Sequence, residues 1–174
     1  VAVARALLAR GLDAVLVDDG DPARLQSLAE DLGAGATSAP AAVHAPDADR
    51  LRELLGAVDA VIPAPGLPEH HPVFAAAATA GRPILSEFYL AGAWDDRPVL
   101  AITGTNGKTT VTTLVTAMLD RSGVRAAAVG NLEVPLVEAI ARDDLDVFVV
   151  EASSFRLAHS RRFAQRWARG STSP

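Results

Sequence analysis

Short apolar runs alternate along the chain with segments in which apolar residues recur every three or four positions. The runs predict buried strands at residues 14–17, 59–62, 83–86, 99–102, 125–129 and 146–150, and a weaker strand between 33 and 43. The periodic segments predict helices at residues 1–10, 22–32, 47–55, 73–80, 88–94 and 135–141. A further helix after residue 107 has an apolar face made of Val111, Leu114, Val115, Met118 and Leu119. Strands that alternate with helices predict an α/β fold with parallel sheets.

Two segments interrupt this alternation. Residues 63–72 contain four prolines and a glycine, which predicts a rigid loop at the carboxyl end of a strand. In open α/β sheets, ligands bind at that edge. Residues 95–97 form a polar linker, and we place a domain boundary near residues 93–97, with a first domain at 1–94 and a second at 95–174.

Composition narrows the classes of function. The chain has 174 residues, of which 49% are hydrophobic, so it can bury a real core. Its net charge of −5 gives no general basic footprint for nucleic acid, and the absence of cysteine excludes disulfides and thiolate metal sites. No apolar run reaches the length of a membrane span and no signal peptide is visible. We therefore expect a soluble cytoplasmic protein that binds neither nucleic acid nor membrane.

The segment at residues 99–119 has the pattern of a phosphate-binding loop. An apolar strand leads into a tight turn with Gly104 and Gly107, and a helix follows. Glycines let backbone N–H groups approach phosphate oxygens, and the helix N-terminus adds partial positive charge there. Lys108 is then placed to reach the β- and γ-phosphates of ATP, and Thr109 to ligate Mg²⁺. The alternative is an ordinary strand–helix turn with one exposed lysine.

This loop departs from the general P-loop pattern G-x-x-x-x-G-K-[ST], because the first glycine of that pattern would fall at Ile102. It keeps the glycine, lysine and threonine at the end of the pattern. The residues that we assign to ATP binding are Gly104, Thr105, Asn106, Gly107, Lys108, Thr109 and Thr110.

Acidic residues follow two of the predicted strands. Glu151 ends the strand at 146–150 and is the candidate carboxylate for Mg²⁺, as a direct ligand or one shell further out, if that strand neighbours the strand of the phosphate loop. The alternative is a glutamate favoured by the N-terminal dipole of a following helix. Asp18 and Asp19 end the strand at 14–17, where a dinucleotide-binding-type unit holds a ribose hydroxyl. They equally fit a turn that leads into a helix beginning at Asp21.

The four histidines suggest no metal site. His44 and His159 lack partners at metal-ligand spacing, and we expect them to be solvated. His70 and His71 are adjacent in the proline loop, and neighbouring residues of an extended segment point apart. A metal shared by this pair is therefore not expected.

Several motifs together resemble the Mur ligase family. The sequence T-G-T-N-G-K-T-T at residues 103–110 resembles its nucleotide loop and that of the related folylpolyglutamate synthetases. The sequence E-A-S-S-F-R-L, which starts at Glu151, resembles the family's E-x-S-S-F-Q-L, and G-N at 130–131 resembles its G-N turn. Residues 65–72 resemble its S-P-G-x-P-x-x-H-P loop, and S-E at 86–87 the start of its S-E-x-x-L-A segment. The resemblance extends to about Phe163.

This resemblance implies a truncated Rossmann-like N-terminal domain followed by a partial P-loop domain with a parallel sheet. It implies ATP-dependent amide formation through an acyl phosphate, with Mg²⁺, in peptidoglycan precursor synthesis. The proline loop and the first domain favour the branch of the family that adds D-glutamate to UDP-MurNAc-L-alanine. A full-length monomer is expected.

The resemblance also implies roles for single residues. Lys108 stabilises the γ-phosphoryl group, and Glu151 joins Thr109 in holding Mg²⁺, so that Lys108 and Glu151 count as catalytic. The residues that would contact the nucleotide-sugar substrate are Asn131, Ser153, Asp18 and Asp19, the two aspartates lying at the uridine.

The chain departs from the family pattern in several places. Ala64 stands where the family has serine, and Arg156 stands where it has glutamine. The family's L-N-x-x-x-D-H-x-D segment, its modified lysine and its amino-acid-binding domain do not occur in this sequence. We expect a chain that lacks the first strand before Val1, is out of frame from about Gln165, and leaves the strand at 146–150 without neighbours. Such a fragment is expected to be poorly soluble and inactive alone.

Four hypotheses follow from these observations. The first is a piece of a Mur ligase of the D-glutamate branch, and the second is a nucleotide-binding module without ligase activity. The third is a truncated product that never folds stably, and the fourth is another member of the Mur ligase family. ATP binding that needs no partner enzyme would favour the module.

Overall fold

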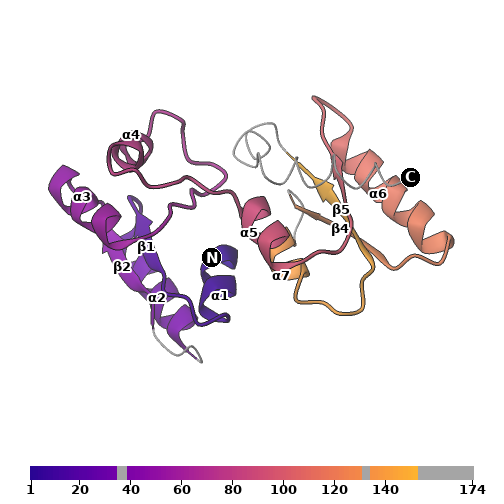
Figure 1. The fold of residues 1–174 in the computed structure, drawn as a ribbon, viewed down its shortest axis with the longest axis horizontal. Helices are drawn as coiled ribbons and strands as arrows, with labels where there is room; N and C mark the ends of the chain where they lie inside the picture. Colours follow the sequence, from indigo (N-terminus) through magenta and orange to yellow (C-terminus); the bar gives the residue numbers. More distant parts are fainter. Residues whose placement is uncertain (35–38, 131–133, 153–174) are drawn as a thin grey trace. The chain divides into compact units, whose positions relative to one another are not determined.

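The computed structural model of the chain describes residues 1–34, 39–130 and 134–152. Helices alternate with parallel strands except between residues 48 and 94, where three helices follow one another (Figure 1), so the predicted α/β class is confirmed. The chain divides into two compact units. The first consists of Val1–Val61 and Pro68–Pro83, and the second of Ile62–Leu67 and Ile84–Pro174.

The first unit is built on a two-stranded parallel sheet. Strand β1 (Val15–Asp18) pairs with β2 (Ala41–His44), so that Asp18 lies opposite His44 at the carboxyl edge. Its helices are α1 (Ala2–Leu8), α2 (Pro22–Gly33), α3 (Ala48–Ala57) and α4 (Pro72–Thr79). Side chains of α1 and α2 pack together with those of β1, among them Leu8, Leu32 and Leu16.

Side-chain caps fix where these helices begin. Asp21 accepts a hydrogen bond from the backbone N–H of Ala23 at 2.9 Å, ahead of a proline at the first helical position of α2. Asp47 accepts from the N–H of Arg50 at 2.8 Å and starts α3 in the same way. These caps place each helix start just beyond a strand or loop of the first unit.

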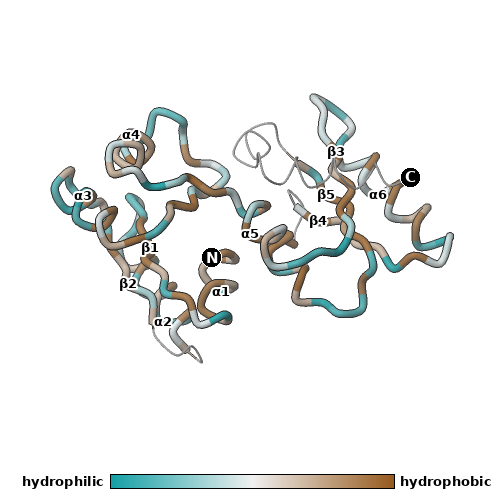
Figure 2. The backbone as a smooth tube through the Cα atoms, viewed as in Figure 1, coloured by the Kyte–Doolittle hydropathy of each residue, from teal (hydrophilic) through white to brown (hydrophobic). Residues whose placement is uncertain are grey.

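The second unit is built on a three-stranded parallel sheet. Its order is β3-β5-β4, formed by β3 (Val99–Ile102), β4 (Ala126–Gly130) and β5 (Val147–Glu151). The helices are α5 (Glu87–Trp94), α6 (Lys108–Arg121) and α7 (Leu136–Ala139). The central strand β5 is hydrophobic until its last residue, Glu151, and follows a hydrophilic loop (Figure 2). Its residues Phe148, Val149 and Val150 are completely buried.

β5 has partners on both sides, which corrects one expectation. We expected the strand at 146–150 to lack neighbours, but β5 lies between β3 and β4, pairing with each in parallel register. Among the strands that the structure describes, β3 and β4 are therefore the edges of this sheet. The most apolar strand takes the central place because only there are both of its backbone edges hydrogen-bonded and both faces covered.

The strands expected at 59–62 and 83–86 are each reduced to one bridge residue. Val61 donates its N–H to the carbonyl oxygen of Pro83 at 3.0 Å, and only Val61 and Ile84 have bridge geometry. Proline has no N–H to donate, and the proline-rich loop begins two residues after Val61. A longer ladder cannot form between these segments.

The apolar face predicted for α6 is also wrong. Val111, Leu114 and Met118 are exposed by 43%, 57% and 61%, whereas Thr112 is completely buried. Val115 and Leu119 are half-buried. The helix therefore turns the face that contains Thr112 toward its own unit.

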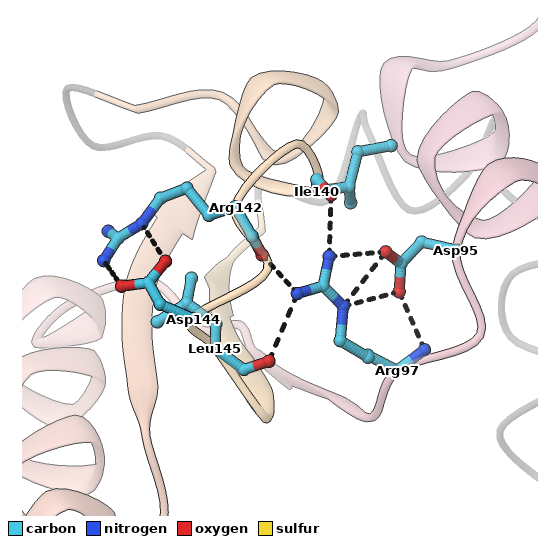
Figure 3. A network of polar contacts seen from close by, with 6 residues as sticks. All are labelled: Asp95, Arg97, Ile140, Arg142, Asp144 and Leu145. Carbon is cyan, nitrogen blue, oxygen red and sulfur yellow. Dashed lines mark hydrogen bonds and ion pairs between the residues drawn. The ribbon is translucent and has the colours of Figure 1, made fainter.

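The linker between α5 and β3 is anchored by Arg97. Its guanidinium group pairs with Asp95 at 2.6 Å and donates to the carbonyl oxygens of Ile140 at 2.7 Å, Leu145 at 3.2 Å and Arg142, as Figure 3 shows. It also lies 4.7 Å from the centroid of the Phe148 ring. The hydrogen bond from Arg97 lowers the pKa of Asp95 below its ordinary value.

The division between the units differs from the boundary that we placed near residues 93–97. Helix α5 belongs to the second unit, because Phe88 and Ala91 are buried in the core that contains Phe148. The Glu87 carboxylate also accepts a hydrogen bond from the N–H of Val137 at 3.1 Å.

Candidate nucleotide-binding site

The loop between β3 and α6 has the backbone shape of a phosphate cradle. Gly104 has a φ of +153° and Gly107 a φ of +75°, conformations that side chains with a Cβ rarely adopt. Gly107 is the N-cap of α6, so the first backbone N–H groups of the helix point out of this loop. The loop residues that we assigned to ATP lie together here, and those with exposed surface are Gly104, Thr105, Asn106, Gly107, Thr109 and Thr110.

Lys108 closes over the loop. Its Nζ atom donates hydrogen bonds to the carbonyl oxygens of Gly104 at 2.8 Å and of Thr105 at 3.3 Å. The ammonium charge therefore lies at the loop itself, next to the start of α6. This arrangement concentrates positive charge where a phosphate group would meet the helix N-terminus.

Thr109 and Glu151 meet at the same place. The Thr109 hydroxyl donates to Glu151 Oε2 at 2.7 Å, although the two residues are 42 positions apart. The contact forms because β3 and β5 are neighbours, with Ile102 paired to Glu151, so that both strand ends reach one edge of the sheet. Thr109 is exposed, whereas Glu151 is only 6% exposed.

Gly130 lets the sheet close tightly beside Glu151. The two residues are paired in the β4–β5 ladder, and a Cβ at position 130 would lie 2.5 Å from the carbonyl oxygen of Glu151. Gly130 also has a φ of +105°. The sequence suggested this glycine only as part of a family motif, and the structure gives it a steric reason.

The Thr109 hydroxyl oxygen and the Glu151 carboxylate oxygens suit a hard divalent cation that also binds a phosphate ligand. Magnesium usually takes one or two carboxylates from the protein and completes its shell with water and substrate phosphates. Within the described ranges, no three His, Cys, Asp or Glu side chains gather at one point. The Thr109–Glu151 pair therefore fits a cation shared with a bound phosphate better than a metal held by protein alone.

The two aspartates assigned to the substrate lie in the first unit. Asp18 Oδ1 accepts from the N–H of Gly20 at 2.7 Å, so Asp18 begins the turn, as one of its two interpretations predicted. Asp19 instead contacts His71, with 2.9 Å between Asp19 Oδ2 and His71 Nε2. The other two substrate residues, Asn131 and Ser153, lie outside the described residues, as does Gln165.

Two histidines have contacts that the sequence did not predict. His44, expected to be solvated, is exposed but lies with its Nε2 atom 2.6 Å from the carbonyl oxygen of Gly20. His71 caps α4, because its Nδ1 atom accepts from the N–H of Val73 at 3.3 Å. Neither contact has a sequence signal, since both depend on how distant side chains are oriented in the fold.

Comparison with known proteins identifies the second unit. Residues 102–168 match the Mur ligase middle domain. The chain is 40% identical over 162 residues to the UDP-N-acetylmuramoylalanine–D-glutamate ligase of Syntrophus aciditrophicus, covering 90% of this chain and 34% of that protein. Residues 102–168 therefore belong to the Mur ligase middle-domain family, and nine-tenths of the chain is similar in sequence to a Mur ligase.

A second relative agrees with this Mur ligase assignment. The enzyme of the same name from Frankia casuarinae is 39% identical over 167 residues, covering 94% of this chain and 34% of its own length. The chain thus spans about a third of the length of the curated Mur ligases that it matches.

A solved Mur ligase shares the fold. The UDP-N-acetylmuramate:L-alanyl-gamma-D-glutamyl-meso-diaminopimelate ligase from Neisseria meningitides matches with a TM-score of 0.50 and 20% identity, over 89% of this chain and 52% of that one. The parallel α/β architecture expected of a Mur ligase is thereby confirmed.

Proposed function

We propose that this chain is the substrate-binding and ATP-binding part of a ligase that adds D-glutamate to UDP-N-acetylmuramoyl-L-alanine. The relatives quoted above carry that name, and the identity of about 40% extends over nine-tenths of the chain. In this proposal the first unit binds the UDP-substrate through Asp18 and Asp19, with Asn131 and Ser153 as further contacts. The second unit binds ATP.

The observation that carries the proposal is the 2.7 Å hydrogen bond between Thr109 and Glu151 beside the glycine loop. An ordinary strand–helix turn has no reason to bring a buried carboxylate to the first helical turn. A site for nucleotide phosphates needs a glycine loop, a lysine and oxygen ligands at one point. Lys108, Thr109 and Glu151 supply these groups.

The reaction that we propose begins with the carboxylate of the L-alanine residue. One of its oxygens attacks the γ-phosphorus of ATP, the bond from that phosphorus to the β–γ bridging oxygen breaks, and ADP leaves. The amine of D-glutamate then attacks the acyl carbon, loses a proton, and inorganic phosphate leaves with the carbon–nitrogen bond formed.

This chain contributes positioning and charge neutralisation to the first step. The backbone N–H groups of the loop orient the phosphates, and Lys108 gives up its two carbonyl partners to bind the γ-phosphoryl oxygens. Thr109 and Glu151 would hold Mg²⁺, which when bound neutralises charge that develops on the phosphate oxygens. Burial of Glu151 keeps its carboxylate fixed at the strand end.

The remaining parts of the proposal concern the protein as a whole. None of the helices in the described part of the chain combines the length and apolar character needed to cross a membrane. We propose a monomeric enzyme that works in the cytoplasm on peptidoglycan precursors. We assign no residue of this sequence to the binding of D-glutamate.

The proposal is tested with the complete polypeptide that contains this sequence. ADP release in the presence of ATP and Mg²⁺ should depend on both UDP-N-acetylmuramoyl-L-alanine and D-glutamate, and the amide product should be seen by mass spectrometry. Replacing D-glutamate with L-glutamate is the matched control. ATP binding without any turnover would favour a nucleotide-binding module, and turnover with a different amino acid would favour another Mur ligase activity.

A further inference from the structure

The turn that follows β1 is fixed by hydrogen bonds on both sides. The N–H of Gly20 donates to Asp18 Oδ1, and the carbonyl oxygen of Gly20 accepts from His44 Nε2. The carbonyl oxygen of Asp18 also accepts from the N–H of Ala45 at 3.0 Å. The backbone of Asp19, between these anchored residues, is therefore held in place at the carboxyl edge of the first sheet.

The side chain of Asp19 is oriented by His71. The Nδ1 atom of His71 accepts from the N–H of Val73, so this nitrogen carries no proton and Nε2 carries it. Nε2 then donates to Asp19 Oδ2 at 2.9 Å. One imidazole ring thus joins the start of α4 to the end of β1.

The two partners differ in exposure. The His71 side chain is 23% exposed, whereas that of Asp19 is 58% exposed. The histidine is thus largely enclosed by the protein, and the carboxylate projects into solvent. Among the described residues, Asp19 Oδ1 has no hydrogen-bond partner, so one oxygen is held while the other can meet a ligand.

We propose that His71 is a positioning residue, which orients the Asp19 carboxylate toward a neutral hydrogen-bond donor on the nucleoside of the UDP-substrate. The inference rests on the proposed function and assigns His71 a role within it. An ionised carboxylate can only accept hydrogen bonds, and it repels the pyrophosphate of the same ligand. The group it meets is therefore a sugar hydroxyl or an imide N–H.

Two substitutions separate this role from the structural role of the same ring. His71→Asn retains a side-chain oxygen that caps α4, because asparagine is among the best N-cap residues, but it is too short to reach Asp19. His71→Gln places an amide N–H near the position of Nε2, so it can still donate to Asp19. The first variant keeps the cap, and the second keeps the contact.

The test is equilibrium binding of UDP-N-acetylmuramoyl-L-alanine to the complete polypeptide, with ATP binding as the internal control. We expect His71→Asn to raise the Kd for the UDP-substrate about tenfold, the effect of losing one hydrogen bond to a charged group, while the Kd for ATP stays unchanged. His71→Gln should restore most of the affinity. In a background with Asp19→Asn, the His71→Asn change should have little further effect, because His71 acts through Asp19.

The outcomes distinguish the two proposals. Unchanged binding of the UDP-substrate by folded His71→Asn overturns the positioning role and leaves the proposed function intact. Additive effects of the two substitutions also overturn it. Absence of binding by the unsubstituted protein overturns the proposed function, and this inference with it.

Discussion

Gly130 ends β4 opposite Glu151 and shows how single residues shape the edge of the second sheet. Alanine there would place its Cβ 2.5 Å from a backbone oxygen, at a φ of +105°. That oxygen cannot move away, because it belongs to the central strand β5. The carboxyl edge that carries Glu151 thus depends on a residue without a side chain.

We expect Gly130→Ala to lower the free energy of unfolding by about 2–4 kcal/mol, the sum of an unfavourable φ and overpacking. The matched control is Gly56→Ala in α3, where a Cβ has nothing within 4 Å and φ is ordinary. That change should be neutral or stabilise by about 0.5–1 kcal/mol. Urea unfolding of both variants measures the difference, and equal losses would contradict the steric account.

The sequence allowed some of these residue contacts to be predicted and not others. Thr109 and Glu151 were expected to meet, because both follow parallel strands whose carboxyl ends share an edge. The Asp19–His71 contact joins residues 52 positions apart and depends on a ring orientation set by a helix cap. A pattern of residue types contains no such information.

Among the elements, the linker into β3 depends on Arg97. Its guanidinium group satisfies Asp95 and the carbonyl oxygens at the end of α7 and before β5, so removing it leaves several partly buried acceptors unpaired (Figure 3). Arg142 pairs with Asp144 as well, but both of those side chains are more than half exposed.

We expect Arg97→Ala to lower the free energy of unfolding by about 2–3 kcal/mol. The matched control Arg142→Ala should change it by less than about 0.5 kcal/mol, because exposed pairs contribute little. Chemical denaturation of the two variants provides the comparison. A similar small effect for both would show that the Arg97 network contributes nothing beyond an ordinary surface pair.

Two aspartates that pair with arginines, Asp95 and Asp146, make the free energy of unfolding depend on pH. The hydrogen bond from Arg97 lowers the pKa of Asp95, and Arg125 lowers the pKa of Asp146 from 3.8 to about 2. A lowered pKa means that the unfolded chain binds more protons than the folded one in this window. The resulting stabilisation is complete above about pH 4 and should be lost as the pH falls toward 2.

The free energy of unfolding should therefore decrease as the pH is lowered from 5 to 2, and solvent screening should make the share of the exposed Arg125–Asp146 pair small. Asp95→Asn and Asp146→Asn should each flatten this dependence, whereas their effect on its slope above pH 5 should be negligible. An unaltered slope in both variants would refute the assignment of these two groups.

Helix α6 shows why the presence of a helix is easier to predict from sequence than the face that it buries. Its helical pattern was clear, yet the apolar residues Val111, Leu114 and Met118 face outward. Thr109 lies on the side of the helix that reaches Glu151, and Thr112 follows one turn later on the same side. The rotation of α6 agrees with the contact at the site, and hydrophobicity alone suggested a different face.

At the scale of the whole molecule, family motifs predicted more of the fold than hydrophobic periodicity did. The strand–loop–helix unit and β5 were located from their residues, and the Mur ligase fold followed from motifs that span both units. The division between the units did not follow, because whether α5 packs on one core or the other depends on Phe88 and Ala91, which are equally apolar in either setting.

The central claim is that the loop at residues 104–110 binds the phosphates of ATP. Lys108 is the only lysine of this sequence, so an amine-acylating reagent reports on one side chain apart from the N-terminus. The decisive measurement is the acylation rate of Lys108 in the peptide that contains it, followed by mass spectrometry with and without ATP and Mg²⁺. We predict that saturating ATP and Mg²⁺ slow the reaction at least about tenfold, while adenosine, which has no phosphates, gives no protection. An acylation rate that ATP leaves unchanged would contradict the account.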